Sequence, residues 1–242
     1  VEVLNAQSAS VIWYTYPPAG SGGQQQWILG VGRIEGNRIV VDQALLTRGA
    51  VFGADFDPDD VQQSPWGRLE LEFNSCNDLV VRYAGPAEFG SGIHQASRLA
   101  GINGLNCDGG TPTPAPSGYS GTWYDTSHNG EGLVFQEIDS SSAALYWFSY
   151  DAHGEQAWFT GIGQRQGNLY RFADVFRPHG SAFGPDFDPS DLSIERWGAV
   201  ELRFNDCNRA DLTYTATDPA YGSGTLSTVR LTQLAGLPCD EP

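Results

Sequence analysis

The stretch that decides the fold is VFGADFDPDDVQQSPWGRLELEFNSCN at Val51–Asn77, which recurs as AFGPDFDPSDLSIERWGAVELRFNDCN at Ala182–Asn208. The matched positions lie 131 residues apart, as Phe52 and Phe183 do. A period of this length is too long for one unit of a solenoid and fits two copies of a small domain. The sequence therefore predicts a tandem repeat.

A spacer separates the two copies. Residues 107–118 read CDGGTPTPAPSG, which is rich in Pro, Gly and Thr and has no apolar periodicity. Such a composition is typical of an extended, semi-rigid linker. We therefore expect a first domain over residues 1–107, a linker over 108–118 and a second domain over 119–242.

The second copy has the pattern of many short strands. Val200, Leu202 and Phe204 fall on one face of residues 197–205, and the charged Glu201 and Arg203 fall on the other. An eight-stranded antiparallel meander closes most simply into an up-and-down barrel, because closure removes exposed sheet edges. The expected strands cover residues 121–126, 133–138, 143–150, 156–164, 169–176, 197–205, 210–217 and 225–234.

The first copy lacks the beginning of this pattern. Val1–Tyr16 aligns with Phe135–Tyr150, so the counterpart of the opening Gly121 would lie upstream of Val1. We predict an all-β chain of two tandem up-and-down antiparallel β-barrels of about eight strands each, the N-terminal one without its first strand.

Two explanations of this gap stay open. The missing residues lie upstream of the given sequence, or the gap is real and leaves a sheet edge that another strand fills. In the second case, foreign backbone should pair beside Val1–Asn5 or Leu99–Ile102.

The composition excludes several classes of function. The chain has 29 acidic and 13 basic residues and a formal net charge of −16, which opposes binding to nucleic acid or to an anionic membrane surface. All basic residues are Arg, which excludes chemistry based on Lys, such as a Schiff base or a P-loop. No apolar run approaches the ~18 residues of a membrane span. We expect no nucleic-acid partner and no membrane insertion.

The four cysteines divide evenly between the copies. Cys76 and Cys107 are 31 residues apart, and Cys207 and Cys239 are 32 residues apart. One disulfide per copy is the natural pairing and implies an oxidising compartment. A zinc site of four thiolates is the alternative, although the chain has no Cys-x-x-Cys spacing. We therefore expect a secreted, extracellular or periplasmic protein.

The opening of the second copy, Gly121-Thr-Trp123-Tyr, is followed by eight strands in a meander and by an Arg in the last strand, Arg230, whose counterpart is Arg98. This arrangement resembles the calycin group, which includes the lipocalins and the avidin-like barrels. The resemblance implies a calycin-like barrel in which the guanidinium stacks on the opening indole and closes one end. The acidic loop and the disulfides are not features of that group.

A longer pattern runs through the whole second copy, GxWYD…GEG…WFxY…QxW…GxG…FGxxFDP…WG…FxxC…FGSG…RL…GLxC. It is similar to a repeat of secreted proteins of Gram-negative bacteria, and this resemblance implies a secreted accessory or surface role without a catalytic assignment. The matching parts are Gly121–Asp125, Gly130–Gly132, Trp147–Tyr150, Gln156–Trp158, Gly161–Gly163, Phe183–Pro189, Trp197–Gly198, Phe204–Cys207, Tyr221–Gly224, Arg230–Leu231 and Gly236–Cys239.

The acidic loop of each copy has two interpretations. Its aspartates stand at alternate positions, as oxygen ligands do in calcium loops, but neither loop has the Gly and Glu positions of an EF-hand. In the second interpretation, which we favour, one Asp per loop is a helix N-cap followed by Pro. The calcium alternative uses Asp55, Asp57, Asp59, Asp186, Asp188 and Asp191; no other cofactor is expected.

Aromatic strands are the best candidates for a binding platform. Residues 12–16 and 146–150 carry aromatic side chains on both faces, and only one face can line a barrel interior. The other face either stacks a sugar ring or a partner's apolar surface, or packs one repeat against the other. The platform would comprise Trp13, Tyr14, Tyr16, Trp27, Trp147, Phe148, Tyr150 and Trp158.

No arrangement of residues indicates catalysis. The four histidines, at positions 94, 128, 153 and 179, have no counterparts in the other copy. The Gly-Ser-Gly triplets at 90–92 and 222–224 lack the strand–turn–helix context of a nucleophile elbow. No carboxylate pair for glycoside hydrolysis can be located from sequence. We predict that the protein is not an enzyme, and a hydrolase is the least favoured alternative.

These features together predict a non-catalytic extracellular structural or binding module of a secreted bacterial protein, acting at a surface or in an assembly. One alternative is a barrel that binds carbohydrate or another small ligand. Another is a filament subunit that polymerises by strand exchange at the open edge of the first repeat. The expected partners are other protein subunits, including further copies of the chain, or a surface glycan.

Overall fold

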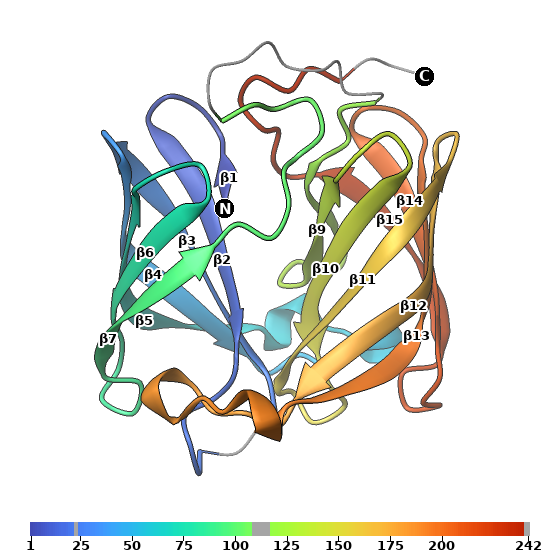
Figure 1. The fold of residues 1–242 in the computed structure, drawn as a ribbon. Helices are drawn as coiled ribbons and strands as arrows, with labels where there is room; N and C mark the ends of the chain where they lie inside the picture. The colour runs from blue at the N-terminus through green and yellow to red at the C-terminus, as the bar shows by residue number, and fades with distance from the viewer. Residues whose placement is uncertain (22–23, 108–116, 240–242) are drawn as a thin grey trace.

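The computed structural model describes residues 1–21, 24–107 and 117–239, so most of the expected linker lies outside the described residues. The chain is all-β, with an open seven-stranded antiparallel sheet followed by a closed eight-stranded antiparallel barrel (Figure 1). We refer to them as the N-terminal sheet and the C-terminal barrel. The predicted fold class is confirmed, including the incomplete first copy.

Each strand of the N-terminal sheet pairs with its neighbours in sequence. Residues of alternate positions, such as Ile39, Val41 and Leu71, point inward and form its core. The strands are β1 (Glu2–Val3), β2 (Ser8–Thr15), β3 (Gln26–Glu35), β4 (Arg38–Arg48), β5 (Gln62–Phe73), β6 (Asp78–Ala84) and β7 (Ser91–Ser97).

The C-terminal barrel repeats this meander and adds the strand that closes it. In that strand, Trp123 lies opposite Leu133 on one side and opposite Arg230 on the other. All eight expected strands are present, although the last ends earlier than predicted because the chain then bends across the barrel end. The strands are β8 (Gly121–Asp125), β9 (Gly132–Glu137), β10 (Ser142–Tyr150), β11 (Gln156–Gln166), β12 (Leu169–His179), β13 (Ser193–Phe204), β14 (Arg209–Ala216) and β15 (Ser223–Arg230).

The acidic loops contain short 3₁₀ turns, η1 (Gly53–Asp55) and η2 (Pro58–Asp60) in the first copy and η3 (Gly184–Asp186) and η4 (Pro189–Asp191) in the second. Asp57 caps η2 by accepting a hydrogen bond from the Asp59 N–H at 2.9 Å. Asp188 caps η4 in the same way, with the Ser190 N–H at 2.8 Å. The N-cap interpretation of these aspartates is confirmed.

The two repeats pack against each other with approximate two-fold symmetry. The Gln156 amide donates to the Trp27 carbonyl at 2.9 Å and accepts from the Trp27 N–H at 3.2 Å. Gln25 makes the same pair of bonds to Trp158, at 2.7 and 3.2 Å. Around these bonds lies an apolar cluster formed by residues of both repeats: Tyr16, Trp27, Ala50, Phe56, Tyr150 and Trp158.

The two repeats also exchange their acidic loops. Phe52 leaves the N-terminal sheet and inserts into the barrel core, where its ring lies 5.1–5.8 Å from five aromatic rings. Phe183 inserts in turn into the N-terminal sheet. The next residues, Gly53 and Gly184, have φ of +91° and +76°, a conformation that favours glycine and turns each loop across the boundary. Figure 1 shows the orange loop of the second copy running beneath the N-terminal sheet.

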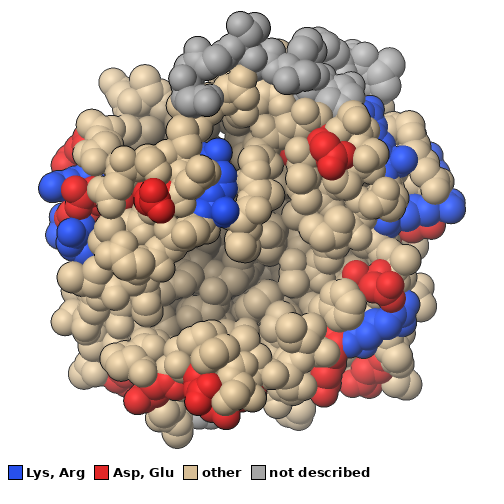
Figure 2. Space-filling view, in the orientation of Figure 1, with Lys and Arg blue, Asp and Glu red and all other residues tan. Residues whose placement is uncertain are grey.

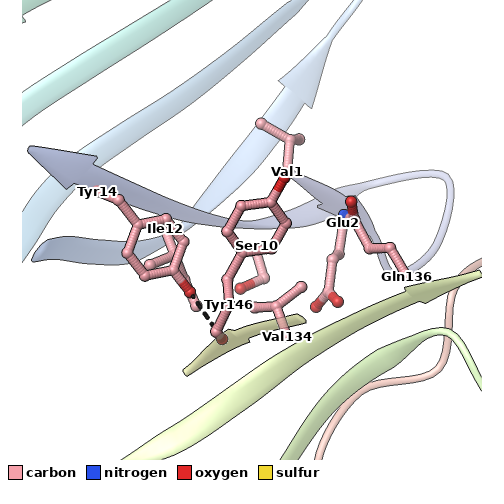
Figure 3. A pocket seen from close by; sticks show the side chains of 8 residues that line it. All are labelled: Val1, Glu2, Ser10, Ile12, Tyr14, Val134, Gln136 and Tyr146. Carbon is pink, nitrogen blue, oxygen red and sulfur yellow. Dashed lines mark hydrogen bonds between the residues drawn. The ribbon is translucent and has the colours of Figure 1, made fainter. Parts of the chain in front are cut away.

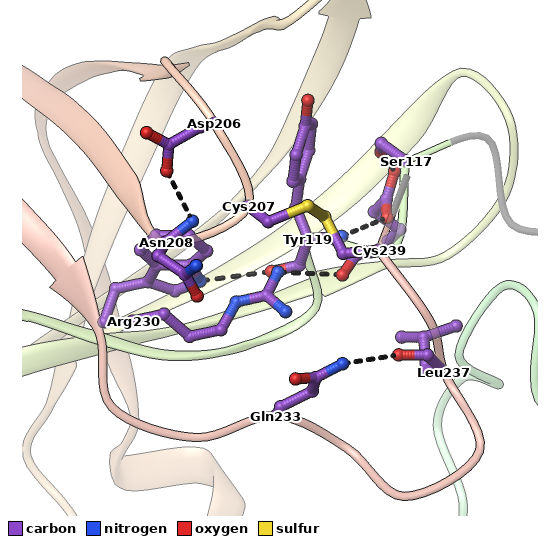
Figure 4. Close-up of a disulfide and its surroundings, with 12 residues drawn as sticks. Ser117, Tyr119, Asp206, Cys207, Asn208, Arg230, Gln233, Leu237 and Cys239 are labelled. Carbon is purple, nitrogen blue, oxygen red and sulfur yellow. Dashed lines mark hydrogen bonds between the residues drawn. A yellow bond between two sulfur atoms is a disulfide. The ribbon is translucent and has the colours of Figure 1, made fainter. Parts of the chain in front are cut away.

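Each repeat is closed by the expected disulfide, Cys76–Cys107 in the first and Cys207–Cys239 in the second. In the barrel, Arg230 lies beside the disulfide (Figure 4), and its guanidinium donates to the Gly118 carbonyl at 2.8 Å. The same guanidinium stacks 4.9 Å from the Trp123 ring centroid, which is the contact that the resemblance to calycins implied.

Candidate functional site

The interior of the N-terminal sheet is less covered than that of the barrel. Phe204 is completely buried in the barrel, and its ring stacks on Tyr119 at 4.1 Å and meets Trp123 at 5.0 Å and Phe135 at 4.9 Å. Its counterpart Phe73 is only partly buried and contacts no aromatic ring among the described residues. Of these residues, Tyr119 and Trp123 have no counterparts in the first copy, whereas Val1 stands at the position of Phe135.

Other matched positions show the same difference. Leu212 is fully buried in the barrel, whereas its counterpart Val81 is partly exposed. Trp147 is buried, whereas its counterpart Trp13 is partly exposed. The space-filling view shows a hollow near the middle of the side that faces the viewer (Figure 2). Uncharged residues line the hollow, and acidic and basic groups lie at its margins. We call the region between β7 and the free part of β2 the open side.

Two strand edges border the open side. On β2, only Ala9 and Ser10 pair with β1, whereas the matched strand β10 pairs with β9 over Ala143–Phe148. On β7, no described strand lies beyond its outer edge. The Arg98 N–H donates to the Asn77 carbonyl, so the N–H and C=O of the preceding residue, Ser97, point away from β6 and into the open side.

Pairing of foreign backbone beside Val1–Asn5 or Leu99–Ile102 stays a prediction, but the structure shows which of these residues form a strand. The first pair of strand residues, Glu2 and Val3, falls within Val1–Asn5, whereas Leu99–Ile102 lies just beyond the end of β7 and is not a strand. Leu99 is 95% exposed and Ile93 on β7 is 63% exposed. The sheet edge that faces the open side is formed by β7 itself.

The eight aromatic residues proposed as a platform lie mostly inside the molecule. Trp147 lines the barrel core and Trp13 the interior of the N-terminal sheet. The other six pack between the repeats, where the Trp27 indole donates to the Ser149 carbonyl and the Trp158 indole to the Thr15 carbonyl, both at 3.2 Å. This is the repeat-to-repeat packing considered from the sequence; a ligand role for these residues stays a prediction.

The aspartates proposed as calcium ligands are spread along the 3₁₀ turns. The hydrogen bond from the Ser190 hydroxyl, together with the capping bond from the Ser190 N–H, lowers the pKa of Asp188 below its usual value. Among the described residues, no group of three or more His, Cys, Asp or Glu side chains is arranged to hold a metal ion. A calcium role of Asp55, Asp57, Asp59, Asp186, Asp188 and Asp191 therefore stays a prediction.

One cluster of polar residues is buried near the loop that precedes β9. The His128 Nδ1 lies 2.7 Å from a carboxylate oxygen of Glu131, and the hydroxyl of the buried Ser149 donates to the other oxygen. This order differs from a catalytic triad, in which the histidine stands between acid and nucleophile. The His128 ring also stacks on Phe56 of the first repeat at 4.7 Å, so the cluster packs against the exchanged loop.

A cavity of about 200 Å³ lies between the outer faces of β2 and β9, beside the open side (Figure 3). It is lined by Glu2, Tyr14, Val134, Gln136 and Tyr146, among others. The Glu2 carboxylate accepts from the hydroxyls of Thr122 and Thr232 with one oxygen, both at 2.8 Å. No described residue donates to its other oxygen, although the side chain is buried.

A second cavity, of about 430 Å³, lies at the end of the N-terminal sheet that Phe183 enters. Its lining includes Trp66 and the polar side chains of Gln26, Arg48, Glu88 and Glu155. At the corresponding end of the barrel, Arg177 donates to the Tyr221 hydroxyl at 2.7 Å. Leu46 occupies the position of Arg177 in the first copy and makes no such bond.

Sequence reasoning missed the exchange of loops between the repeats. Phe52 and Phe183 belong to the duplicated stretch, and each of them enters the other repeat. Sequence reasoning also missed Gln25 and Gln156, which recur at the same spacing as Phe52 and Phe183. Their recurrence was the available signal, but recurrence alone does not tell contacts within a repeat from contacts between repeats.

The described residues contain no helix long and apolar enough to span a membrane. The two disulfides indicate an oxidising compartment outside the cytoplasm. Comparisons of the chain with protein-family models, with curated proteins and with solved structures found no match.

Proposed function

We propose that this chain is a non-catalytic structural or binding module of an extracellular assembly, and that it holds another segment of polypeptide in its open side. One observation carries the proposal: the same fold occurs twice in the chain, and only the N-terminal copy leaves its core partly uncovered. Partly exposed core residues such as Phe73 and Val81 gain free energy when a further strand removes them from water.

The edge of β7 supports strand addition. Natural proteins protect free sheet edges with charged residues, Pro or bulges, because unpaired N–H and C=O groups attract other strands. β7 reads SGIHQAS and has no Pro, Asp, Glu, Lys or Arg. It is also seven residues long, which is enough to pair with a second strand over its whole length.

A selection experiment tests whether the open side accepts polypeptide at all. Random peptides displayed on phage would be selected against the whole chain and then tested against a Ser97→Pro variant. Proline removes the outward N–H of β7 without removing a bond to β6. We expect peptides that lose binding to Ser97→Pro, retain it to a Ser97→Ala control, and slow amide exchange in β7. Peptides that bind both variants equally well and slow amide exchange at surfaces other than β7 would contradict the proposal.

The 430 Å³ cavity supports a second candidate function, the binding of a small polar ligand such as a saccharide. It places the Trp66 side chain beside acids, an arginine and an amide, a combination that suits sugar hydroxyls. Titration of a glycan panel into the protein while tryptophan fluorescence is followed provides the test. A saturable change that disappears in Glu88→Gln would support this function, and unchanged fluorescence across the panel would exclude it for the sugars tested.

A further inference from the structure

In the C-terminal barrel, the region that corresponds to the open side is covered by a β-hairpin. There, β8 and the first residues of β9 form a hairpin between β15 and β10. Trp123 and Leu133 of this hairpin are each no more than 1% exposed and belong to the barrel core. The hairpin therefore supplies both the missing backbone ladder and the missing core side chains.

The N-terminal sheet retains the residues that would contact such a hairpin. Arg98 matches Arg230, which stacks on Trp123 in the barrel, yet among the described residues the exposed Arg98 guanidinium makes no hydrogen bond, ion pair or ring contact. Val11–Tyr14 of β2 match the part of β10 that pairs with β9. The acceptor groups are thus present on both sides of the gap.

We propose that the open side binds a β-hairpin of the same kind as Gly121–Val134. This inference rests on the proposed function and specifies its partner. The defining features are Gly and Trp at alternate positions of the first strand and an apolar residue in the second strand that pairs beside Trp13.

The register follows from the barrel. Trp123 lies opposite Arg230 and Tyr124 opposite Val229, so the donor Trp lies opposite Arg98 and the next residue opposite Ser97. On the other side, Leu133 lies opposite Trp147, so its equivalent in the donor lies opposite Trp13. Val1 already stands at the position of Phe135, which sets the end of the donor hairpin at the equivalent of Val134.

A second copy of this chain is a poor donor. Its β8 is hydrogen-bonded on both sides and carries the buried Trp123. Moving β8 into a neighbour would open one barrel for each sheet that it closes, with no net gain in buried area. The donor is therefore a hairpin that is not already part of a closed barrel.

The probe is a synthetic, fluorescein-labelled, C-terminally amidated peptide with the sequence of Gly121–Val134, GTWYDTSHNGEGLV. Its anisotropy would be followed as the whole chain is added, and amide exchange of the complex would locate it. We expect saturable binding, protection of β7 and of residues 11–14, and a rise in Tm. Binding without protection of these edges would overturn the inference.

Matched variants test the register. Trp123→Ala in the peptide should weaken binding by about 100-fold or more, because it removes the buried anchor. Arg98→Ala in the protein should weaken it by about tenfold through loss of the cation–π contact. Ser97→Pro should abolish binding, and Ser97→Ala should leave it unchanged. Equal affinity of the Trp123→Ala peptide would show that the donor is not of this kind.

The outcomes separate the two proposals. If display yields edge-binding peptides without the Gly-x-Trp pattern and the hairpin peptide fails, the acceptor function stands and this donor is wrong. If no peptide of either origin engages β7, both proposals fall. A concentration-dependent dimer in light scattering, abolished by Ser97→Pro without any peptide present, would show that a second copy occupies the edge and would overturn the inference.

Discussion

The N-terminal sheet and the C-terminal barrel have the same strand order, the same disulfide and the same capped loop, yet only the barrel closes. The difference comes from one hairpin, formed by β8 and the start of β9. Without it, seven strands still keep their register, and the curvature of the sheet still leaves a place for the missing hairpin. Closure is therefore separable from the rest of this fold.

The exchange of loops explains how the open copy keeps its shape. Phe183 of the barrel packs in the N-terminal sheet at 5.1 Å from both Tyr83 and Phe89 and at 5.2 Å from Trp13. The barrel thus supplies part of the core that the open sheet lacks. Because Phe52 does the same for the barrel, the two repeats depend on each other for stability.

The largest expected effect is the loss of stability when Phe204, in the barrel core, is replaced. Phe204→Ala should lower the free energy of unfolding by about 3–5 kcal/mol, because the ring is fully enclosed by other aromatic side chains. The matched Phe73→Ala should cost only about 1–2 kcal/mol, because Phe73 is already partly exposed. Urea denaturation of both variants measures the difference. Equal losses would mean that the two interiors are covered to the same extent.

The exchanged loops allow a test of dependence between repeats. Phe52→Ala should cost about 3 kcal/mol, and amide exchange should accelerate in β8–β15 although Phe52 belongs to the first copy. Phe183→Ala should accelerate exchange in β1–β7 instead. The two variants are controls for each other. Acceleration confined to the repeat that carries the substitution would contradict the exchange.

A smaller effect is expected for the paired glutamines between the repeats. Gln156→Ala leaves the N–H and C=O of the buried Trp27 without partners and should cost about 1–3 kcal/mol. Gln25→Ala should cost a similar amount through Trp158 and should also remove the hydrogen bond that Arg177 donates to Gln25 at 2.9 Å. Thermal unfolding of the single and double variants checks this. If neither single variant loses stability, water replaces the hydrogen bonds of the two glutamines.

The smallest effect is a pH response of opposite sign in the two repeats. Burial against Trp13, Tyr83 and Phe183 lowers the pKa of His94, so the N-terminal sheet should lose stability as the pH falls below about 6.5, where only the unfolded state takes up a proton. The hydrogen bond to Glu131, aided by nearby Asp125, raises the pKa of His128. That stabilisation is present below about pH 6.5 and should be lost as the pH rises through the raised value.

Two substitutions separate these responses. His94→Leu introduces the residue that the barrel has at the matched position, Leu226. This substitution should remove the loss of stability of the N-terminal sheet at low pH. His128→Gln should remove the loss at high pH. Urea midpoints at pH 5.5 and pH 8 for each variant, compared with those of the unsubstituted chain, provide the measurement. A shift of both variants in the same direction would refute the opposite signs.

Much of the fold could be predicted because its signals are local. The alternation around Val200, Leu202 and Phe204 marks a strand with one buried face, and the same alternation recurs in the first copy. Asp57 and Asp188 before Pro mark capped turns, since the cap depends on neighbouring residues alone. The disulfides followed from the even division of four cysteines between two copies.

The candidate site could be predicted only in part. The alignment of Val1–Tyr16 with Phe135–Tyr150 indicated a gap, but it placed one acceptor edge at Leu99–Ile102, whereas the free strand is β7. The strand ends where the chain must leave the sheet toward the disulfide, and this depends on distant contacts. Likewise, the sequence left open whether the aromatic residues bind a ligand or pack between the repeats.

By itself, the sequence determined that this protein is an all-β chain with a duplicated fold, because strand periodicity, turn residues and repetition depend on residues that are close together in the sequence. Only the tertiary structure decided that Phe52 and Phe183 cross between the repeats, that Gln25 and Gln156 join them, and that the core around Phe73 stays partly uncovered. In a duplicated sequence, a residue fits its own repeat and the other equally well. The choice between them depends on how the two copies pack, which no local pattern contains.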